Sequence, residues 1–176
     1  MNCFDILMLV FTGGIALGTF VLVVFAYKQI NQVAKKQQLK GKSEIIEFAK
    51  NASEWDFTAD DNTYLQSSKQ PWIASKVIIM NHINQVTDIM RSGHIISNTL
   101  SGAKSAIIKR MVDNLLSELM GLRLSLIELQ SKINFIVETT PPEFIKQLDE
   151  VGKQKEKVHN AGEILFGEVA KSIGSF

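Results

Sequence analysis

The feature that most constrains this chain is an uninterrupted apolar stretch near its N-terminus, Ile6–Ala26 (ILMLVFTGGIALGTFVLVVFA). Its 21 residues include no charged side chain. As an α-helix rising about 1.5 Å per residue, the stretch spans about 30 Å, which matches the hydrocarbon core of a bilayer. A backbone in lipid must satisfy its own hydrogen bonds, so a single span has to be helical. The stretch therefore predicts a transmembrane helix, with residues 1–27 forming the membrane segment and a short external tail.

Neither a secretory signal nor a soluble core helix fits this stretch. A signal peptide has a basic region, a shorter apolar run and a small-residue cleavage site. Here Asp5 is the only charged residue before the run, and Ala26 is followed by Tyr27 and Lys28. A soluble helix of this length would show a polar face. The single cysteine, Cys3, supplies neither a disulfide framework nor a metal cluster.

Lysines set the expected orientation of the span. No Lys or Arg precedes it, whereas five lysines follow it closely: Lys28, Lys35, Lys36, Lys40 and Lys42. The positive-inside rule predicts that the N-terminus lies outside and that residues 28–176 lie in the cytoplasm. The net charge of the whole chain is only +1, so no global field argues for nucleic acid as a partner.

The remainder of the chain is predicted to be helical, which makes the fold class all-α. Good helix formers continue the membrane helix through residues 28–50, with Gly41 as a weak point. Residues 51–70 are predicted to be an acidic loop, because residues 51–66 are rich in Asn, Asp, Ser and Thr. Three aromatic residues are expected to dock this loop onto the core: Trp55, Phe57 and Tyr64. Residues 71–176 are predicted to form a helical bundle.

The bundle has one dominant pattern, a heptad seam from Ile108 to Ile136. A second apolar stripe widens it, so this helix is expected to be central. Gly121 lies within it and costs about 1 kcal/mol relative to Ala unless another backbone approaches closely there. An earlier helix is predicted from Pro71 to Gly93, and one or two helices are predicted after Pro142. The leucines expected to form the core or an oligomer seam are Leu115, Leu119, Leu122, Leu126 and Leu129.

Small residues in the span predict helix association. They allow helix backbones to approach closely in a membrane, and Gly14 to Gly18 is a small-xxx-small step. The predicted packing or pore-lining residues are Thr12, Gly13, Gly14, Gly18 and Thr19. Several copies around an axis would enclose an apolar pore gated by dewetting. Its predicted mouths are Asn2 and Asp5 outside, with Lys28, Gln29, Gln32 and Lys36 inside.

The sequence contains no strong motif for a catalytic or metal-binding site. His82, His94 and His159 have no metal-ligand spacing, so no metal or cofactor is predicted. No nucleophile elbow and no phosphate-binding glycine loop is recognisable. Helical nucleases of one class pair an Arg with a His four to six residues later. Here Lys153 and Lys155 precede His159, so the segment is a weak catalytic candidate and is better explained as a solvated helix face.

The layout resembles that of the small membrane accessory proteins of type VI-B CRISPR loci. The resemblance rests on the span Ile6–Ala26, the seam Ile108–Ile136 and the degenerate nuclease-like motif ending at His159. It implies a HEPN-like bundle and a ring-like homo-oligomeric pore in the bacterial inner membrane. It also implies a functional partner, an RNA-guided RNA nuclease whose antiphage defence the pore enhances. Lysine in place of arginine argues against ribonuclease activity and favours a scaffold, so an enzyme is not expected.

Three functions therefore stay open at the level of sequence. The first is a homo-oligomeric pore that permeabilises or depolarises the membrane. The second is a membrane-tethered HEPN-like RNA-binding or ribonuclease domain that uses His159 with Lys153 and Lys155. The third is an adaptor that recruits a cytoplasmic partner to the lipid bilayer. Direct nucleic-acid binding is left undecided by the sequence.

Overall fold

The computed structural model describes residues 3–66, 72–100, 105–134 and 142–173, with the backbone alone at residues 3–21, 23, 35, 37, 38, 72, 73, 134, 172 and 173. Its elements are α1 (Cys3–Ser53), α2 (Ala59–Gln66), α3 (Trp72–Thr99), α4 (Ala106–Ser131), the 3₁₀ helix η2 (Lys132–Asn134) and α5 (Pro142–Ile173). No strand occurs within these ranges, which confirms the all-α class.

The chain divides within α1 into two units, Met1–Gly41 and Lys42–Phe176. In the first unit the backbone is helical from Cys3 onward, and the helix continues through Gly41 without a break. The prediction of helix over residues 28–50 is therefore confirmed. All the side chains described between Leu22 and Lys40 are exposed.

Among the residues whose side chains are described, no helix is both long enough and apolar enough to cross a membrane.

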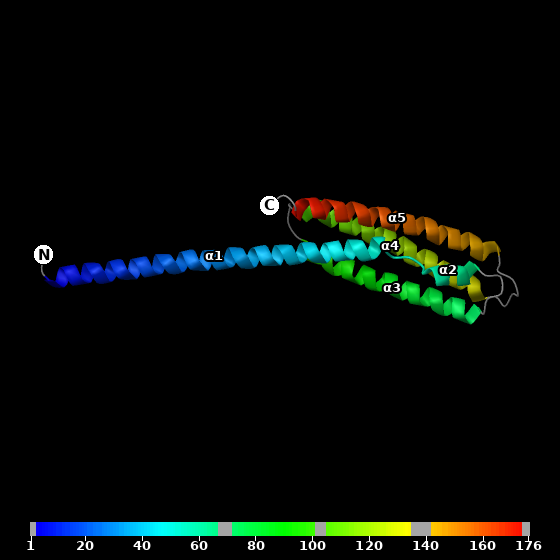
Figure 1. Ribbon diagram of the computed structural model, residues 1–176, viewed down its shortest axis with the longest axis horizontal. Coiled ribbons are helices and arrows are strands. Elements are labelled where there is room, and N and C mark those ends of the chain that lie inside the picture. The colour runs from blue at the N-terminus through cyan, green and yellow to red at the C-terminus, as the bar shows by residue number, and fades with distance from the viewer. Residues whose placement is uncertain (1–2, 67–71, 101–104, 135–141, 174–176) are drawn as a thin grey trace. The chain divides into compact units, whose positions relative to one another are not determined.

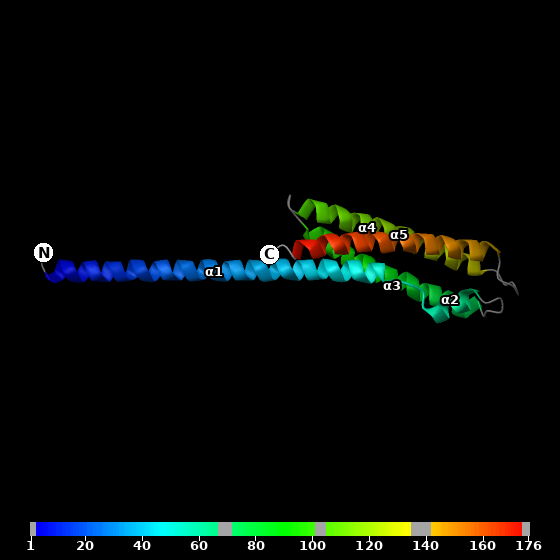
Figure 2. The same cartoon turned by 45° about the horizontal axis from the view of Figure 1, so that its top comes forward.

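In the second unit, α3, α4 and α5 run alternately in opposite directions, and α4 packs against both of the others (Figures 1 and 2). The core-facing residues of α4 repeat at heptad spacing, and the five predicted seam leucines are fully or almost fully buried: Leu115, Leu119, Leu122, Leu126 and Leu129. The expectation of a central helix with neighbours on more than one side is confirmed. The seam leucines belong to the core of the single chain.

Two glycines allow helices to approach closely in this core. A Cβ at Gly93 would lie 2.5 Å from Cζ of Phe48 and 2.8 Å from Cδ2 of Leu116. A Cβ at Gly162 would lie 2.9 Å from the carbonyl oxygen of Ala49 and 2.9 Å from Cβ of Ser53. The first contact joins α1, α3 and α4, and the second presses α5 against the last turns of α1. Both glycines are therefore required by packing.

The predicted end of a helix at Gly93 is wrong. The residue lies inside α3, which continues to Thr99, and its missing side chain makes room for Phe48. At Gly121 the group that approaches closely is the side-chain amide of Gln154 and not a backbone. Gln154 Nε2 donates to the carbonyl oxygen of Glu118 at 3.1 Å and to its carboxylate at 2.9 Å.

The predicted acidic loop over residues 51–70 is wrong for most of its described length. Residues 51–53 complete α1, residues 59–66 form α2, and only residues 54–58 are non-helical. The cause is a capping box, in which the Asp61 backbone N–H donates to Thr58 Oγ1 at 3.0 Å and the Thr58 N–H donates to Asp61 Oδ2 at 3.3 Å. Of the three aromatic residues predicted to dock onto the core, Trp55 and Phe57 are buried in it, whereas Tyr64 is only partly buried.

α4 ends earlier than predicted, and α5 begins where predicted. α4 ends at Ser131 and continues as η2, earlier than the predicted end near Thr139, and residues 135–141 lie outside the described ranges. A single helix, α5, follows from Pro142. On α3, Val77 and Met80 are 54% and 48% exposed, and the buried face includes Ile79, His82, Val86 and Met90.

Candidate functional site

The predicted catalytic candidate His159 lies on α5 beside the end of α1. Its Nδ1 is 3.0 Å from the carbonyl oxygen of Ser53. A carbonyl only accepts, so the imidazole donates through Nδ1–H and its Nε2 carries the lone pair. The last carbonyls of a helix have no partner within the helix, and this bond satisfies one of them for α1. His159 itself is exposed.

The two lysines of the candidate motif lie on different faces of α5. Lys155 forms an ion pair with Asp56, directly after α1, at 2.5 Å between Nζ and Oδ2. Lys155 lies one turn before His159 on α5. The two side chains therefore contact neighbouring residues of another segment, since Lys155 binds Asp56 and His159 binds Ser53. Lys153 is rotated by roughly 160° from Lys155 around the helix and pairs with Glu150 at 2.7 Å.

The exposed ion pair between Lys153 and Glu150 shifts the pKa values of both groups. The hydrogen bond from Lys153, followed by the attraction of its charge, lowers the pKa of Glu150. The same hydrogen bond raises the pKa of Lys153. Both side chains are exposed, so water screens the interaction. The structure thus brings His159 and Lys155 together and leaves Lys153 apart from them.

A second histidine, His82 on α3, forms a cluster with the same connecting segment. It is 5% exposed, and its Nε2 is 3.0 Å from Oδ2 of Asp61. Its ring makes edge contacts with Phe57 at 4.6 Å and with Trp55 at 5.5 Å between centroids. Trp55 and Phe57 also contact each other at 5.5 Å. The sequence pattern missed this cluster, although the T-x-x-D spacing of Thr58 and Asp61 signals the start of α2.

Hydrogen bonding determines the charge of Asp61. Burial raises the pKa of this carboxyl, but hydrogen bonds from the Thr58 side chain, from His82 and from the Thr58 backbone outweigh it, so the net pKa lies below 3.8. The carboxylate is therefore ionised and accepts the Nε2–H of His82. In a neutral His82 this leaves Nδ1 as the acceptor nitrogen.

Two nitrogens of this cluster are enclosed without a hydrogen-bond partner in the described part of the chain, Trp55 Nε1 and His82 Nδ1. Trp55 and Phe57 of this cluster also line a cavity of about 260 Å³, together with residues of α2 and α5 that include Asn62, Val151 and Gly152. The cluster and this cavity share the segment after α1, and together they form a candidate site of the bundle.

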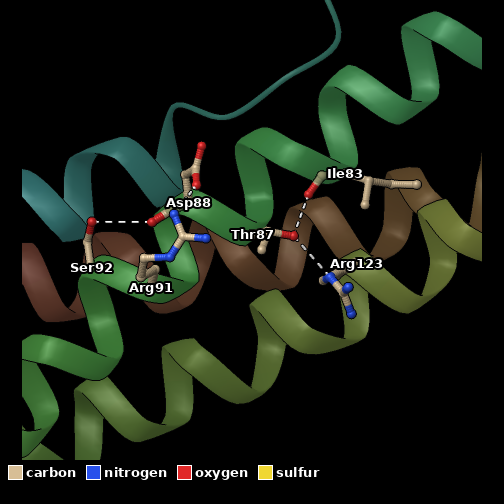
Figure 3. A network of polar contacts seen from close by, with 6 residues as sticks. All are labelled: Ile83, Thr87, Asp88, Arg91, Ser92 and Arg123. Carbon is tan, nitrogen blue, oxygen red and sulfur yellow. Dashed lines mark hydrogen bonds and ion pairs between the residues drawn. The ribbon is translucent and has the colours of Figure 1, made fainter.

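A separate polar network joins α3 to α4 (Figure 3). Arg123 Nε donates to Thr87 Oγ1 at 3.0 Å, and the Thr87 hydroxyl donates to the carbonyl oxygen of Ile83 at 2.7 Å. Arg91 pairs with Asp88 at 2.7 Å, one turn along the same face of α3. The bond from Arg123 to Thr87 crosses from α4 to α3, whereas the pair between Arg91 and Asp88 lies within α3.

The remaining predicted site residues belong to α1 or precede it. Four of them lie exposed on the helix and are not brought together by the single chain: Lys28, Gln29, Gln32 and Lys36. The others lie outside the residues or side chains that the structure describes: Asn2, Asp5, Thr12, Gly13, Gly14, Gly18 and Thr19. No group of three metal-binding side chains occurs within the described residues.

Comparisons with protein-family models, with curated proteins and with solved structures find no match to this chain.

Proposed function

We propose that this protein is a membrane-anchored helical bundle that assembles into a homo-oligomeric pore. The observation that carries the proposal is that the charge-free stretch Ile6–Ala26 falls wholly within α1, whose backbone is helical from Cys3 to Ser53. A continuous helix satisfies its own hydrogen bonds, which is the requirement for crossing lipid. The lysines that follow the stretch favour a cytoplasmic bundle and an external N-terminus.

The surface of α1 supports assembly. Its described apolar side chains after the charge-free stretch have no covering partner in the single chain: Tyr27 is 66%, Ile30 is 66% and Val33 is 55% exposed. Several copies of the helix side by side would cover these side chains. The spacing of Gly14 and Gly18 permits close contact between neighbouring spans. The resulting pore is apolar along its length, with Lys28 and Lys36 near its cytoplasmic mouth.

The biological role we assign is permeabilisation or depolarisation of the bacterial inner membrane during infection. It comes from the resemblance in layout to the accessory proteins of type VI-B CRISPR loci, which implies an RNA-guided RNA nuclease as the functional partner. In this role the bundle is a HEPN-like scaffold. The contacts made by His159 and Lys155 are compatible with a scaffold, because both side chains already hold the segment around the end of α1, whereas Lys153 pairs with Glu150 on its own helix.

One observation favours a second candidate, a tethered RNA-binding or ribonuclease domain. The bond from Nδ1 to Ser53 orients the ring of His159, and the residue is exposed, as a general base acting on a bound RNA requires. If the imidazole acts on RNA, His159→Gln abolishes defence while the oligomer stays intact. Undiminished defence in that variant excludes catalysis by His159.

Release of a small dye from liposomes that contain the protein tests the pore. The double variant Gly14→Leu/Gly18→Leu blocks close contact between spans, so we expect it to lose at least nine-tenths of the release rate. Gly41→Leu is the control, because a Cβ at Gly41 meets nothing within 4 Å. Replacing the whole span by an unrelated membrane helix should abolish release as well. Defence that survives this replacement would instead identify an adaptor.

A further inference from the structure

We propose that the pore conducts anions in preference to cations. Every charged side chain between Asp5 and Glu44 is a lysine, so the helix that follows the span carries one sign of charge. The five residues are Lys28, Lys35, Lys36, Lys40 and Lys42. Ion selectivity of this kind rests on the proposed function, and it names the class of ion that the pore carries.

The first of these lysines lies directly at the end of the span. The backbone is helical without a break from Cys3 to Ser53, so Lys28 lies about 3 Å beyond Ala26 along the helix axis. Lys36 follows about 12 Å farther along. The Debye length at physiological ionic strength is about 8 Å, so the charge of Lys28 acts on any ion that enters the span. In a ring of identical subunits, each of these charges is repeated once per copy.

Two of the lysines have no carboxylate to balance their charge. Lys28 and Lys36 are exposed, and neither forms an ion pair or hydrogen bond with another residue in the part of the chain that the structure describes. In the bundle unit, by contrast, Lys50, Lys153 and Lys155 each pair with a carboxylate. The full charge of Lys28 and Lys36 is therefore available to attract ions from solution.

Packing between copies leaves these two lysines in water. Tyr27 and Ile30 are each 66% exposed, and they are among the side chains that neighbouring helices would cover. At about 100° per residue, Lys28 and Lys36 are each rotated by about 100° or more from both of them. The apolar side chains can therefore lie between helices while the ammonium groups remain at the cytoplasmic mouth.

Nothing in the span opposes this positive mouth, because Ile6–Ala26 contains no charged side chain. Rings of Lys or Arg are the device by which pores favour anions, since they raise the local concentration of anions and repel cations. Asp5 at the predicted external mouth supplies a single carboxylate per subunit. Anions should therefore enter more readily from the cytoplasmic mouth. The potential of the inner membrane, negative inside, drives them outward, and their loss depolarises the cell.

The reversal potential of the current across a planar bilayer tests the selectivity. The full-length protein is reconstituted in phosphatidylcholine, whose headgroups carry no net charge, and a gradient of KCl is applied across the bilayer. We expect chloride to permeate at least about tenfold better than potassium. The larger current should flow when anions enter from the mouth that carries the lysines.

Charge-reversal variants assign the selectivity to the two lysines. Lys28→Glu/Lys36→Glu should lower the ratio of chloride to potassium permeability at least about tenfold, whereas Lys28→Arg/Lys36→Arg keeps both charges and should keep the ratio. Lys146→Glu/Lys157→Glu is the matched control, because it makes the same change of charge at two exposed lysines of α5 and should leave the ratio unchanged. Particle imaging shows whether each variant still forms the ring. If charge reversal disrupts the ring, Lys28→Gln/Lys36→Gln gives the same comparison with a smaller expected drop.

The outcomes separate this proposal from the pore itself. A parent current that is unselective or that favours potassium overturns anion selectivity and leaves the pore standing. A permeability ratio that neither the Glu nor the Gln double variant lowers has the same meaning. A parent protein that carries no current overturns the pore, and the anion selectivity falls with it.

Discussion

The imidazole of His159 donates a hydrogen bond of 3.0 Å to the carbonyl oxygen of Ser53, a residue 106 positions earlier in the chain. This bond attaches the end of α1 to α5. Next to it, Gly162 lets α5 press against the backbone of the same turn, and Lys155 holds Asp56. The segment that follows the long N-terminal helix is thus fixed at three points by one face of α5.

His159→Ala should lower the free energy of unfolding by about 1 kcal/mol, because a helix-end carbonyl loses its partner. Urea unfolding of the protein in mild detergent measures this difference. Asn160→Ala is the control, since Asn160 is the exposed neighbour on α5, and we expect it to have no measurable effect. Equal stability of the two variants would show that the bond contributes nothing.

Gly93→Ala should destabilise the bundle by about 1–3 kcal/mol, because its Cβ would collide with the Phe48 ring and with Leu116. Gly152→Ala should act in the opposite direction and stabilise by up to about 1 kcal/mol, because the new methyl group meets open space. The two midpoints of urea unfolding, compared with that of the parent, check the signs. A stabilising Gly93→Ala would contradict the packing described for α1, α3 and α4.

Leu122→Ala should cost about 2–5 kcal/mol, because the side chain is fully buried in the core. Leu124→Ala, two residues along the same helix, removes an equally large side chain that is 51% exposed, and we expect a change below about 0.5 kcal/mol. Denaturant unfolding of both variants under one set of conditions gives the comparison. Similar losses would mean that the exposed face of α4 is covered in the assembled protein.

The stability of the fold should fall at acidic pH because of Asp61. Its pKa in the folded chain lies below 3.8, so the ionised carboxylate stabilises the fold above that value. This contribution is lost as the pH falls through the lowered folded pKa. Asp61→Asn should therefore be less stable than the parent at pH 7, with a difference that shrinks below about pH 4. A difference in stability that stays constant from pH 7 to pH 3 would show that the ionised Asp61 carboxylate does not stabilise the fold.

The sequence predicted those parts of the fold that depend on repeated spacing. The heptads of α4 and the start of α5 at Pro142 follow from side-chain periodicity and from the fixed φ of proline, and both are found. The loop composition of residues 51–66 was misleading, because one capping box between Thr58 and Asp61 outweighs the low helix propensity of Asn and Asp.

The features that sequence reasoning missed depend on contacts between distant segments. Gly93 is ambiguous in sequence, since glycine both ends helices and lets them pack closely, and only Phe48 decides between these roles. The role of His82 has no signal in the local sequence, because its partners Trp55 and Asp61 come from outside its own helix. The cavity beside Trp55 could not be foreseen for the same reason.

Particle imaging with mass determination on protein purified in mild detergent tests the central claim most directly. The proposed pore predicts a closed ring of identical subunits, with the Ile6–Ala26 helices arranged around an open axis. A protein that stays strictly monomeric across concentrations would contradict it.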